Sequence, residues 1–269
     1  MSDVEASPRE LLDLALEAAR AATELVAERA AKGVRVEATK SSETDVVTEA
    51  DRASEELIRR TILARRPDDA FLGEEGDDVT GTSGVRWIVD PIDGTVNFLY
   101  GIPRYAISIA AEVDGSIVAG VVVDVPHRVA YTAYRDGATV LAYRNGEPLH
   151  VRGETPLSQR LVATGFSYSA QVRRLQGQAL VRLLPRVRDV RRAGSCALDI
   201  CSVAEGSTDG YFEEGVHLWD YAAATLVAEG AGARWRLEQG LAGGELVICA
   251  PGHGLAELRE AVAEAGFIA

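Results

Sequence analysis

The sequence predicts a layered fold in which an α+β half is followed by an α/β half. Two amphipathic helices come first, hairpin-forming strands follow them, and strands alternate with helices after about residue 150. No repeat, low-complexity tract or long linker separates these regions. We therefore expect two parts, 1–150 and 151–269, which pack tightly and form a functional site at their interface.

Two helices are expected at the start of the chain, and both have N-terminal capping signals. Ser7 stands three residues before Glu10, which is the spacing of a capping box. Thr48 and Asp51 have the same spacing before a second apolar-periodic run, which we expect to stop before Pro67. Asp51 would then lie in the first helical turn, where the helix dipole favours a carboxylate.

The remaining elements are predicted from short apolar runs and turn residues. Asp114-Gly115 and Asn145-Gly146 are typical of two-residue hairpin turns. The strands expected in the first half are 70–73, 85–89, 106–113, 117–125, 129–134 and 139–143. The second half should contain strands at 161–164, 187–190, 209–212, 233–237 and 246–249, and helices at 173–184, 195–204, 220–229 and 255–265.

Composition and charge exclude several classes of protein. The chain of 269 residues has 47% hydrophobic and 26% charged residues, as globular proteins do. A net charge of −13 argues against nucleic-acid binding, because the phosphate backbone would be repelled. We find neither an apolar run of about 18 residues nor a signal-peptide pattern, so we expect a cytoplasmic protein without membrane contact. Cys196, Cys201 and Cys249 form no CxxC pair and are expected to be reduced and buried.

Acidic residues lie where the predicted strands and helices begin or end. The strand at 85–89 leads directly into Asp90, and Asp93 follows in the same turn, so both carboxylates can face one point. Gly94 would let the backbone approach a ligand closely, and Thr95 supplies a hydroxyl group. Three further acidic residues have comparable positions: Glu74, Glu213 and Asp220.

These carboxylates suit a magnesium site. Oxygen ligands without histidine or cysteine partners are the donor set that Mg²⁺ prefers. A helix cap or a solvated loop would explain any one of the acidic residues alone. It does not explain Asp90, Ile92, Asp93, Gly94 and Thr95 in this order after an apolar strand.

The segment 87–95 (WIVDPIDGT) strongly resembles the first signature of the inositol monophosphatase family. The segments 218–223 and 229–232 resemble its second signature. Other segments that fit the family in the right order are 45–51, 73–75 and 194–197. The resemblance covers roughly residues 10–265 and is closest to actinobacterial inositol-1-monophosphatases through 98–103 and 187–192. It implies a sandwich of α-β-α-β-α layers like that of the inositol monophosphatases and fructose-bisphosphatases.

The resemblance also implies a role for individual residues. The implied ligands of two Mg²⁺ ions are Glu74, Asp90, the Ile92 carbonyl, Asp93, Thr95 and Asp220, with Asp90 shared and a weaker third ion bound to Glu74 through water. The implied substrate contacts are Asp93, Gly94, Thr95, Cys196, Glu213 and Asp220. The implied catalytic residues are Asp51, Glu74, Thr95 and Asp220.

The reaction implied is a Mg²⁺-dependent, Li⁺-sensitive hydrolysis of inositol monophosphate by water, without a covalent phospho-enzyme. Glu74 and Thr95 would orient the water, with Asp51 polarising the Thr95 hydroxyl, and Asp220 would help to protonate the leaving alkoxide. A homodimer is also implied. The arginine-rich segment 182–192 is either part of its interface or solvated surface.

Two alternatives remain at the level of sequence. One is another small phosphomonoesterase, acting on histidinol phosphate, fructose-1,6-bisphosphate or 3′-phosphoadenosine 5′-phosphate. Selectivity would lie in 166–170, 194–196 and Glu213, and segment 166–168 departs from the animal-type pattern. The other is a non-catalytic role in RNA processing through binding to the transcription machinery, for which an intact carboxylate set would be unnecessary.

Overall fold

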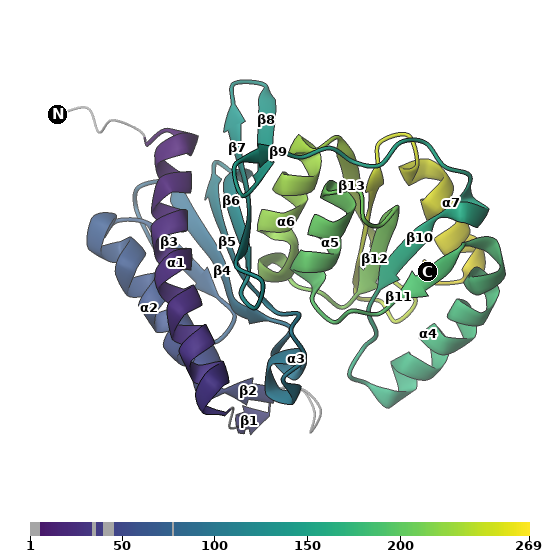
Figure 1. The fold of residues 1–269 in the computed structure, drawn as a ribbon, viewed down its shortest axis with the longest axis horizontal. Coiled ribbons are helices and arrows are strands. Elements are labelled where there is room, and N and C mark those ends of the chain that lie inside the picture. The colour runs from purple at the N-terminus through teal and green to yellow at the C-terminus, as the bar shows by residue number, and fades with distance from the viewer. Residues whose placement is uncertain (1–5, 34–35, 40–45, 77) are drawn as a thin grey trace.

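The computed structural model describes residues 6–33, 36–39, 46–76 and 78–269. Layers of helix and sheet alternate across the molecule, as Figure 1 shows, and the predicted α-β-α-β-α sandwich is confirmed. Asp45, the first residue of one family-like segment, lies outside the described residues.

The first layer consists of helices α1 (Pro8–Lys32) and α2 (Glu49–Arg65). Both predicted capping boxes are confirmed. The Ser7 hydroxyl accepts the backbone N–H of Glu10 while the Glu10 carboxylate accepts the N–H of Ser7. Thr48 and Asp51 make the equivalent reciprocal contacts at the start of α2. These caps fix where each helix begins, and so they place Asp51 in the first turn of α2.

The second layer is a seven-stranded sheet in which the strands are neighbours in chain order. Its strands are β3 (Ala70–Gly73), β4 (Val85–Asp93), β5 (Ala106–Val113), β6 (Ser116–Asp124), β7 (Val129–Asp136), β8 (Thr139–Arg144) and β9 (Glu147–Pro148). Only the β3–β4 pair is parallel. The two predicted hairpin turns are confirmed, since Asp114-Gly115 and Asn145-Gly146 both have positive φ angles, which fit the twist of such hairpins.

Strand β4 differs from the prediction, because it continues beyond Val89 to Asp93. Asp90 therefore lies inside the strand and pairs with Ser108, and Asp93 pairs with Ala106, with a register shift between them. The cause is Pro91, which has no N–H to donate to the ladder. The chain bulges at this point, and the next N–H, that of Ile92, donates to the Asp90 carboxylate at 2.9 Å instead. A short helix, α3 (Thr95–Tyr100), follows directly.

The fourth layer is a five-stranded sheet in the order β11-β10-β12-β14-β13. Its strands are β10 (Leu161–Thr164), β11 (Asp189–Arg191), β12 (Gly210–Glu214), β13 (Ala233–Gln239) and β14 (Glu245–Pro251). Helices α4 (Ala170–Leu183) and α7 (Leu255–Ala265) cover its outer face. Among the described residues, the smaller elements are β1 (Val36–Thr39), β2 (Val46–Thr48) and two short 3₁₀ turns at Leu157–Gln159 and Leu184–Arg186.

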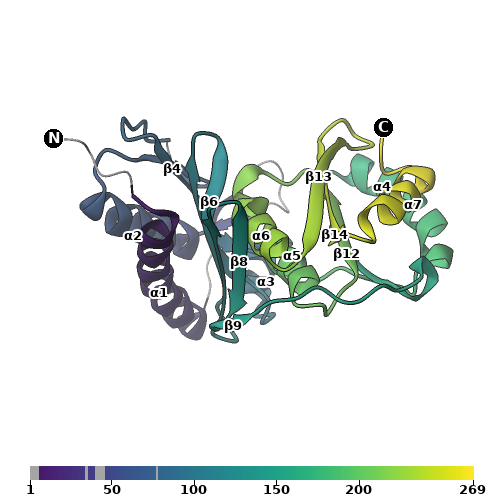
Figure 2. The same ribbon diagram turned by 90° about the horizontal axis from the view of Figure 1, so that it is seen from above.

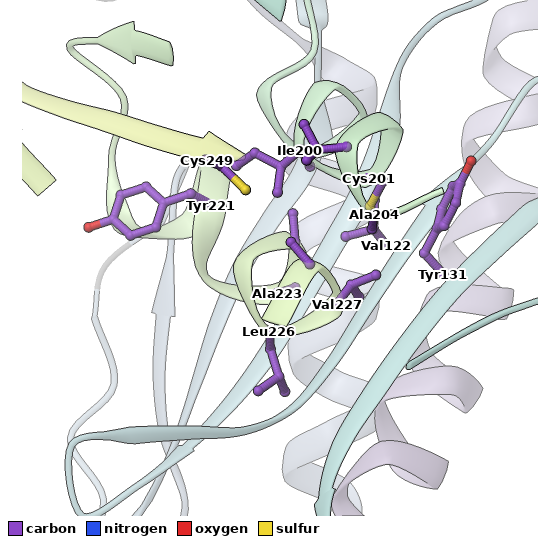
Figure 3. Close-up of a cluster of buried hydrophobic side chains, with 14 of the residues drawn as sticks. Val122, Tyr131, Ile200, Cys201, Ala204, Tyr221, Ala223, Leu226, Val227 and Cys249 are labelled. Atoms are coloured by element: carbon purple, nitrogen blue, oxygen red, sulfur yellow. The ribbon is translucent and has the colours of Figure 1, made fainter. Parts of the chain in front are cut away.

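The third layer lies between the two sheets and consists of α5 (Cys196–Ala204) and α6 (Leu218–Gly230), as Figure 2 shows from above. A helix with a sheet on each side must be apolar nearly all round, and all nine residues of α5 are buried. The core around these helices includes Val122 and Tyr131 of the larger sheet and Cys249 of the smaller one (Figure 3). One hydrophobic core therefore joins the two halves of the chain and fixes where α5 and α6 begin.

Candidate active site

Three carboxylates from the two halves of the chain meet at one point. Asp90 and Asp93 come from the end of β4, and Asp220 comes from the first turn of α6. Each offers an oxygen atom, and these oxygens all lie within 4.8 Å of one another. Asp90 and Asp93 face one point, as their spacing in the sequence predicts, and Asp220, which the family resemblance assigned to the same ion, joins them from more than a hundred residues away.

The electrostatics of this cluster call for a positive charge. Burial, and then the carboxylates of Glu74, Asp93 and Asp220, raise the pKa of Asp90 well above its ordinary range. Burial, followed by Glu74 and Asp93, does the same to the pKa of Asp220. Like charges that are this close destabilise one another in their ionised form. The donor set consists of oxygen atoms, so the residues fit a hard divalent cation.

Asp93 is held in place by the N-terminus of α5. Its carboxylate accepts the Ser195 hydroxyl at 2.5 Å, the backbone N–H of Ala197 at 2.7 Å and that of Cys196 at 3.2 Å. Burial raises the pKa of Asp93 to about 6, although these hydrogen bonds lower it. Helix N-termini stabilise carboxylates through their unpaired N–H groups and the helix dipole. Sequence analysis did not predict this contact, because Ser195 and Asp93 lie about a hundred residues apart in the chain.

A second group of contacts links α2 to the turn after β4. The Thr95 hydroxyl lies 3.1 Å from Oδ1 of Asp51 and 3.0 Å from the carbonyl oxygen of Ile92. Its single proton can be donated to only one of these acceptors at a time. Oδ2 of Asp51 meanwhile accepts the backbone N–H and the hydroxyl of Thr48. Asp51 thus caps its own helix and orients Thr95, while burial raises its pKa to about 6.

Gly94 lies where two loops from the two halves touch. Its φ angle is 94°, in the left-handed region that favours glycine, and it precedes α3. A Cβ atom at this position would lie 3.0 Å from the carbonyl oxygen of Gly194. The Asn97 side-chain amide spans the same contact by donating to the carbonyls of Arg104 and Ala193 at 2.7 and 2.8 Å. The backbone of Gly94 and Thr95 is therefore fixed beside the three carboxylates.

Glu213 lies near the end of β12, and Cys196 is the first residue of α5. The Glu213 carboxylate accepts the Tyr211 hydroxyl at 3.0 Å, and burial raises its pKa to about 7. A Cβ atom at Gly165 would overlap this carboxylate at 1.8 Å, so Gly165 is a supporting residue that sequence analysis missed. The backbone N–H of Cys196 is used by Asp93, and its thiol is buried beside Tyr211. The contacts of Glu213 and Cys196 with substrate remain predictions.

The comparison with known proteins decides the family. The profile of the inositol monophosphatase family matches residues 7–265, nearly the whole chain. The protein belongs to the inositol monophosphatase family. The resemblance seen in the sequence is thereby confirmed, and the protein is a phosphoric monoester hydrolase by family.

Individual members of the family are similar over most of their length. The inositol-1-monophosphatase SuhB of Mycobacterium tuberculosis is 48% identical over 236 residues, which cover 85% of this chain and 81% of that protein. The Nus factor SuhB of Escherichia coli is 37% identical over 227 residues, covering 82% and 83%. The solved structure of Mycobacterium tuberculosis SuhB superposes with a TM-score of 0.82 at 39% identity, covering 98% of this chain and 99% of that one.

Glu74 lies beside this carboxylate cluster. It follows β3 directly, and β3 pairs in parallel with β4, so Glu74 emerges beside Asp90. Its effect on the pKa values of Asp90 and Asp220 places its carboxylate near both.

Among the residues that the structure describes, none lies in a helix long and apolar enough to cross a membrane.

Proposed function

We propose that this family member hydrolyses inositol monophosphate to inositol and phosphate with the aid of Mg²⁺. The convergence of Asp90, Asp93 and Asp220 carries the proposal, because two buried carboxylates and a half-buried one that repel one another suit a site for divalent cations. The relative that is 48% identical is named an inositol-1-monophosphatase, which supports the choice of substrate.

The proposal assigns two principal Mg²⁺ sites. Asp90, Asp93 and Asp220 would hold one ion, and Asp90 with Glu74, Thr95 and the Ile92 carbonyl would hold the other. A third, weaker ion would bind Glu74 through water. When bound, Mg²⁺ neutralises phosphoryl oxygens and lowers the pKa of a coordinated water. With these ions present, the four acidic side chains become a locally positive site, although the net charge of the chain is −13.

The chain itself would orient the attacking water and the substrate. Thr95 and Glu74 would hold the water, and Asp51 keeps the Thr95 hydroxyl directed toward the site through the 3.1 Å contact. Asp220 would assist protonation of the leaving alkoxide.

Substrate contacts are proposed on two sides of this water. The N–H groups of Gly94 and Thr95 would donate hydrogen bonds to phosphate oxygens, because they lie where a residue with a left-handed backbone conformation precedes a helix. Asp93, Asp220, Glu213 and Cys196 would contact the inositol ring and its hydroxyl groups.

We further propose a cytoplasmic homodimer whose interface includes the segment 182–192. The Arg182 Nε donates to the Ala265 carbonyl at 2.7 Å and Arg186 pairs with Glu264, so these two arginines are engaged within the chain. The exposed side chains of Val181 and Leu184 are close to these arginines in the chain. Exposed apolar side chains of this kind support a partner surface. Sedimentation analysis of the oligomeric state tests this part of the proposal.

Phosphate release tests the proposed reaction. The panel contains inositol monophosphate, histidinol phosphate, fructose-1,6-bisphosphate and 3′-phosphoadenosine 5′-phosphate, each with and without Mg²⁺ and Li⁺. We expect the highest kcat/KM on inositol monophosphate, dependence on Mg²⁺ and inhibition by Li⁺. Comparable rates on all four esters would contradict a dedicated inositol enzyme.

Asp90→Asn tests the metal assignment within the same assay. We expect the protein to stay folded, because the asparagine carbonyl can still accept the Ile92 N–H. Turnover should fall at least about 100-fold, because the variant loses the carboxylate that the proposal assigns to both ions. Asp209→Asn is the matched control, because Asp209 is also buried and also accepts a backbone N–H, that of Leu161. Near-normal turnover by Asp90→Asn would contradict the assignment.

A binding role is the second candidate, because a relative of 37% identity is named a Nus factor. Such a role would not require the carboxylate cluster. Binding of the purified protein to purified RNA polymerase and its transcription factors, measured for wild type and Asp90→Asn, tests it. Equal binding by both proteins would support a role independent of catalysis, and the absence of binding by wild type would remove this candidate.

A further inference from the structure

Glu55, to which the proposed function gives no role, lies directly behind the loop that carries Glu74. It is on α2, and only 5% of the residue is exposed. Its carboxylate accepts the backbone N–H of Glu75 at 2.8 Å and also the N–H of Gly76. Burial raises the pKa of Glu55, so these backbone donors hold the carboxylate in place against a cost in desolvation.

Glycine at positions 73 and 76 makes room for this carboxylate. A Cβ atom at Gly73 would lie 2.3 Å from Oε2 of Glu55, and a Cβ atom at Gly76 would lie 2.6 Å from Oε1. Both separations are far shorter than van der Waals contact, so a side chain at either position would displace the carboxylate. The loop 73–76 therefore wraps around Glu55, which occupies the space on its inner side.

The loop is anchored at both ends, and Glu74 lies between the anchors. Gly73 is the last residue of β3 and pairs with Val89, directly before Asp90. Glu55 fixes the other end at Glu75 and Gly76. After burial, Glu74 is the largest cause that raises the pKa of both Asp90 and Asp220. The direction in which Glu74 points thus depends on a loop whose far end is held by Glu55.

We propose that Glu55 is a positioning residue, which fixes the 73–76 loop so that Glu74 faces Asp90 and thereby sets the affinity of the site for a divalent cation. The identity of that cation as Mg²⁺ rests on the proposed function. The residues that hold a metal ligand in place typically change metal affinity 10- to 100-fold when they are replaced.

The first test compares Glu55→Gln with Glu56→Gln in the full chain. Glutamine keeps the size of Glu55 and one acceptor oxygen, but its NH₂ group faces the second backbone N–H. Glu56 is the next residue on α2 and is exposed, so its variant removes the same charge without touching the loop. Titration calorimetry with MgCl₂ in the absence of substrate should show about 10-fold or weaker Mg²⁺ binding for Glu55→Gln. Glu56→Gln should bind Mg²⁺ as wild type does.

Enzyme assays add a second readout. The Mg²⁺ concentration that gives half-maximal rate should rise by the same factor in Glu55→Gln, while kcat at saturating Mg²⁺ stays within about threefold of wild type. A Tm measured without Mg²⁺ separates these effects from a loss of stability.

The second test is a double-mutant cycle between Gly73 and Glu55. Gly73→Ala should weaken Mg²⁺ binding on its own, because the new methyl group displaces the carboxylate. In Glu55→Ala the space is free, so adding Gly73→Ala should cost little further affinity. Contacting residues show such non-additivity, whereas independent ones do not.

The outcomes separate the two proposals. Unchanged Mg²⁺ affinity in Glu55→Gln, with or without a lower Tm, would overturn the positioning role and leave the proposed function intact. Additive losses in the cycle would also overturn it. A wild type that binds Mg²⁺ without hydrolysing inositol monophosphate would overturn the proposed function, while weaker binding by Glu55→Gln would still support the positioning role. A wild type that binds no Mg²⁺ would overturn both.

Discussion

Glu213 differs from the other acidic residues of the site in its surroundings. It comes from β12 and accepts a hydrogen bond from Tyr211, whereas Asp90, Asp93 and Asp220 form the carboxylate cluster itself. Burial raises its pKa from an ordinary value of 4.5 to about 7. Two carboxylic environments thus exist side by side, one suited to cations and one suited to hydroxyl groups of a ligand. The same residue type has different chemistry in each because its neighbours differ.

The raised pKa of Glu213 predicts a pH dependence of stability. The folded protein binds this proton more tightly than the unfolded chain does between about pH 4.5 and pH 7, so stability falls as pH rises through this window. Urea unfolding in EDTA at pH 5 and pH 8 should show wild type losing about 2–3 kcal/mol relative to Glu213→Gln. The Gln variant serves as the reference because it cannot titrate. A difference that does not change with pH would contradict the raised pKa.

At the scale of elements, the sequence predicted the helices and strands whose signals are local. The capping boxes at Ser7 and Thr48 and the hairpin turns at 114–115 and 145–146 are each encoded within a few residues. The continuation of β4 through Pro91 was missed, because it depends on pairing with β5. A local pattern cannot show contacts between residues that are distant in the chain.

The site shows the same limit. The order of Asp90, Asp93 and Gly94 predicted a cation site, because these residues are neighbours in sequence. The support of Asp93 by α5 and that of Glu213 by Gly165 could not be predicted, because each joins segments that lie about fifty or a hundred residues apart.

Helix α5 depends on Ser195 at its N-terminus, and this gives a prediction for an element. The Ser195 hydroxyl accepts the N–H of Leu198 and donates to Asp93, so Ser195→Ala removes a helix cap and a partner of Asp93 together. We expect a loss of about 1–2 kcal/mol in the free energy of unfolding, together with lower turnover. Ser7→Ala at the exposed start of α1 is the matched control, which should affect stability alone. Equal turnover in the two variants would contradict a link between α5 and the site.

At the scale of the whole molecule, the halves 1–150 and 151–269 are joined by shared packing and by polar contacts. Helices α5 and α6 belong to the second half but pack against the sheet of the first, and the core includes residues from both. Arg104 adds an ion pair across this junction, since it donates to Asp199 at 2.8 Å and to the Ser202 hydroxyl at 3.0 Å. The site lies at the same junction, so its geometry depends on how firmly the halves are held together.

This junction predicts that the chain unfolds in one step and that Arg104 contributes to its stability. In urea, far-UV circular dichroism and tryptophan fluorescence should give coincident transitions, because neither sheet can expose its inner face without disrupting α5 and α6.

Arg104→Met should leave Asp199 buried without its cation and lower the free energy of unfolding by about 1–3 kcal/mol. This loss is smaller than for a fully buried pair, because the Arg104 side chain is 32% exposed. Arg128→Met, which breaks the exposed pair with Glu24, should leave the transition unchanged.

Hydrogen exchange is a further test of one-step unfolding, and it should show both sheets losing protection at the same urea concentration. Two separate transitions would instead show that 1–150 and 151–269 are independent domains, and the carboxylate cluster would then form only when they dock.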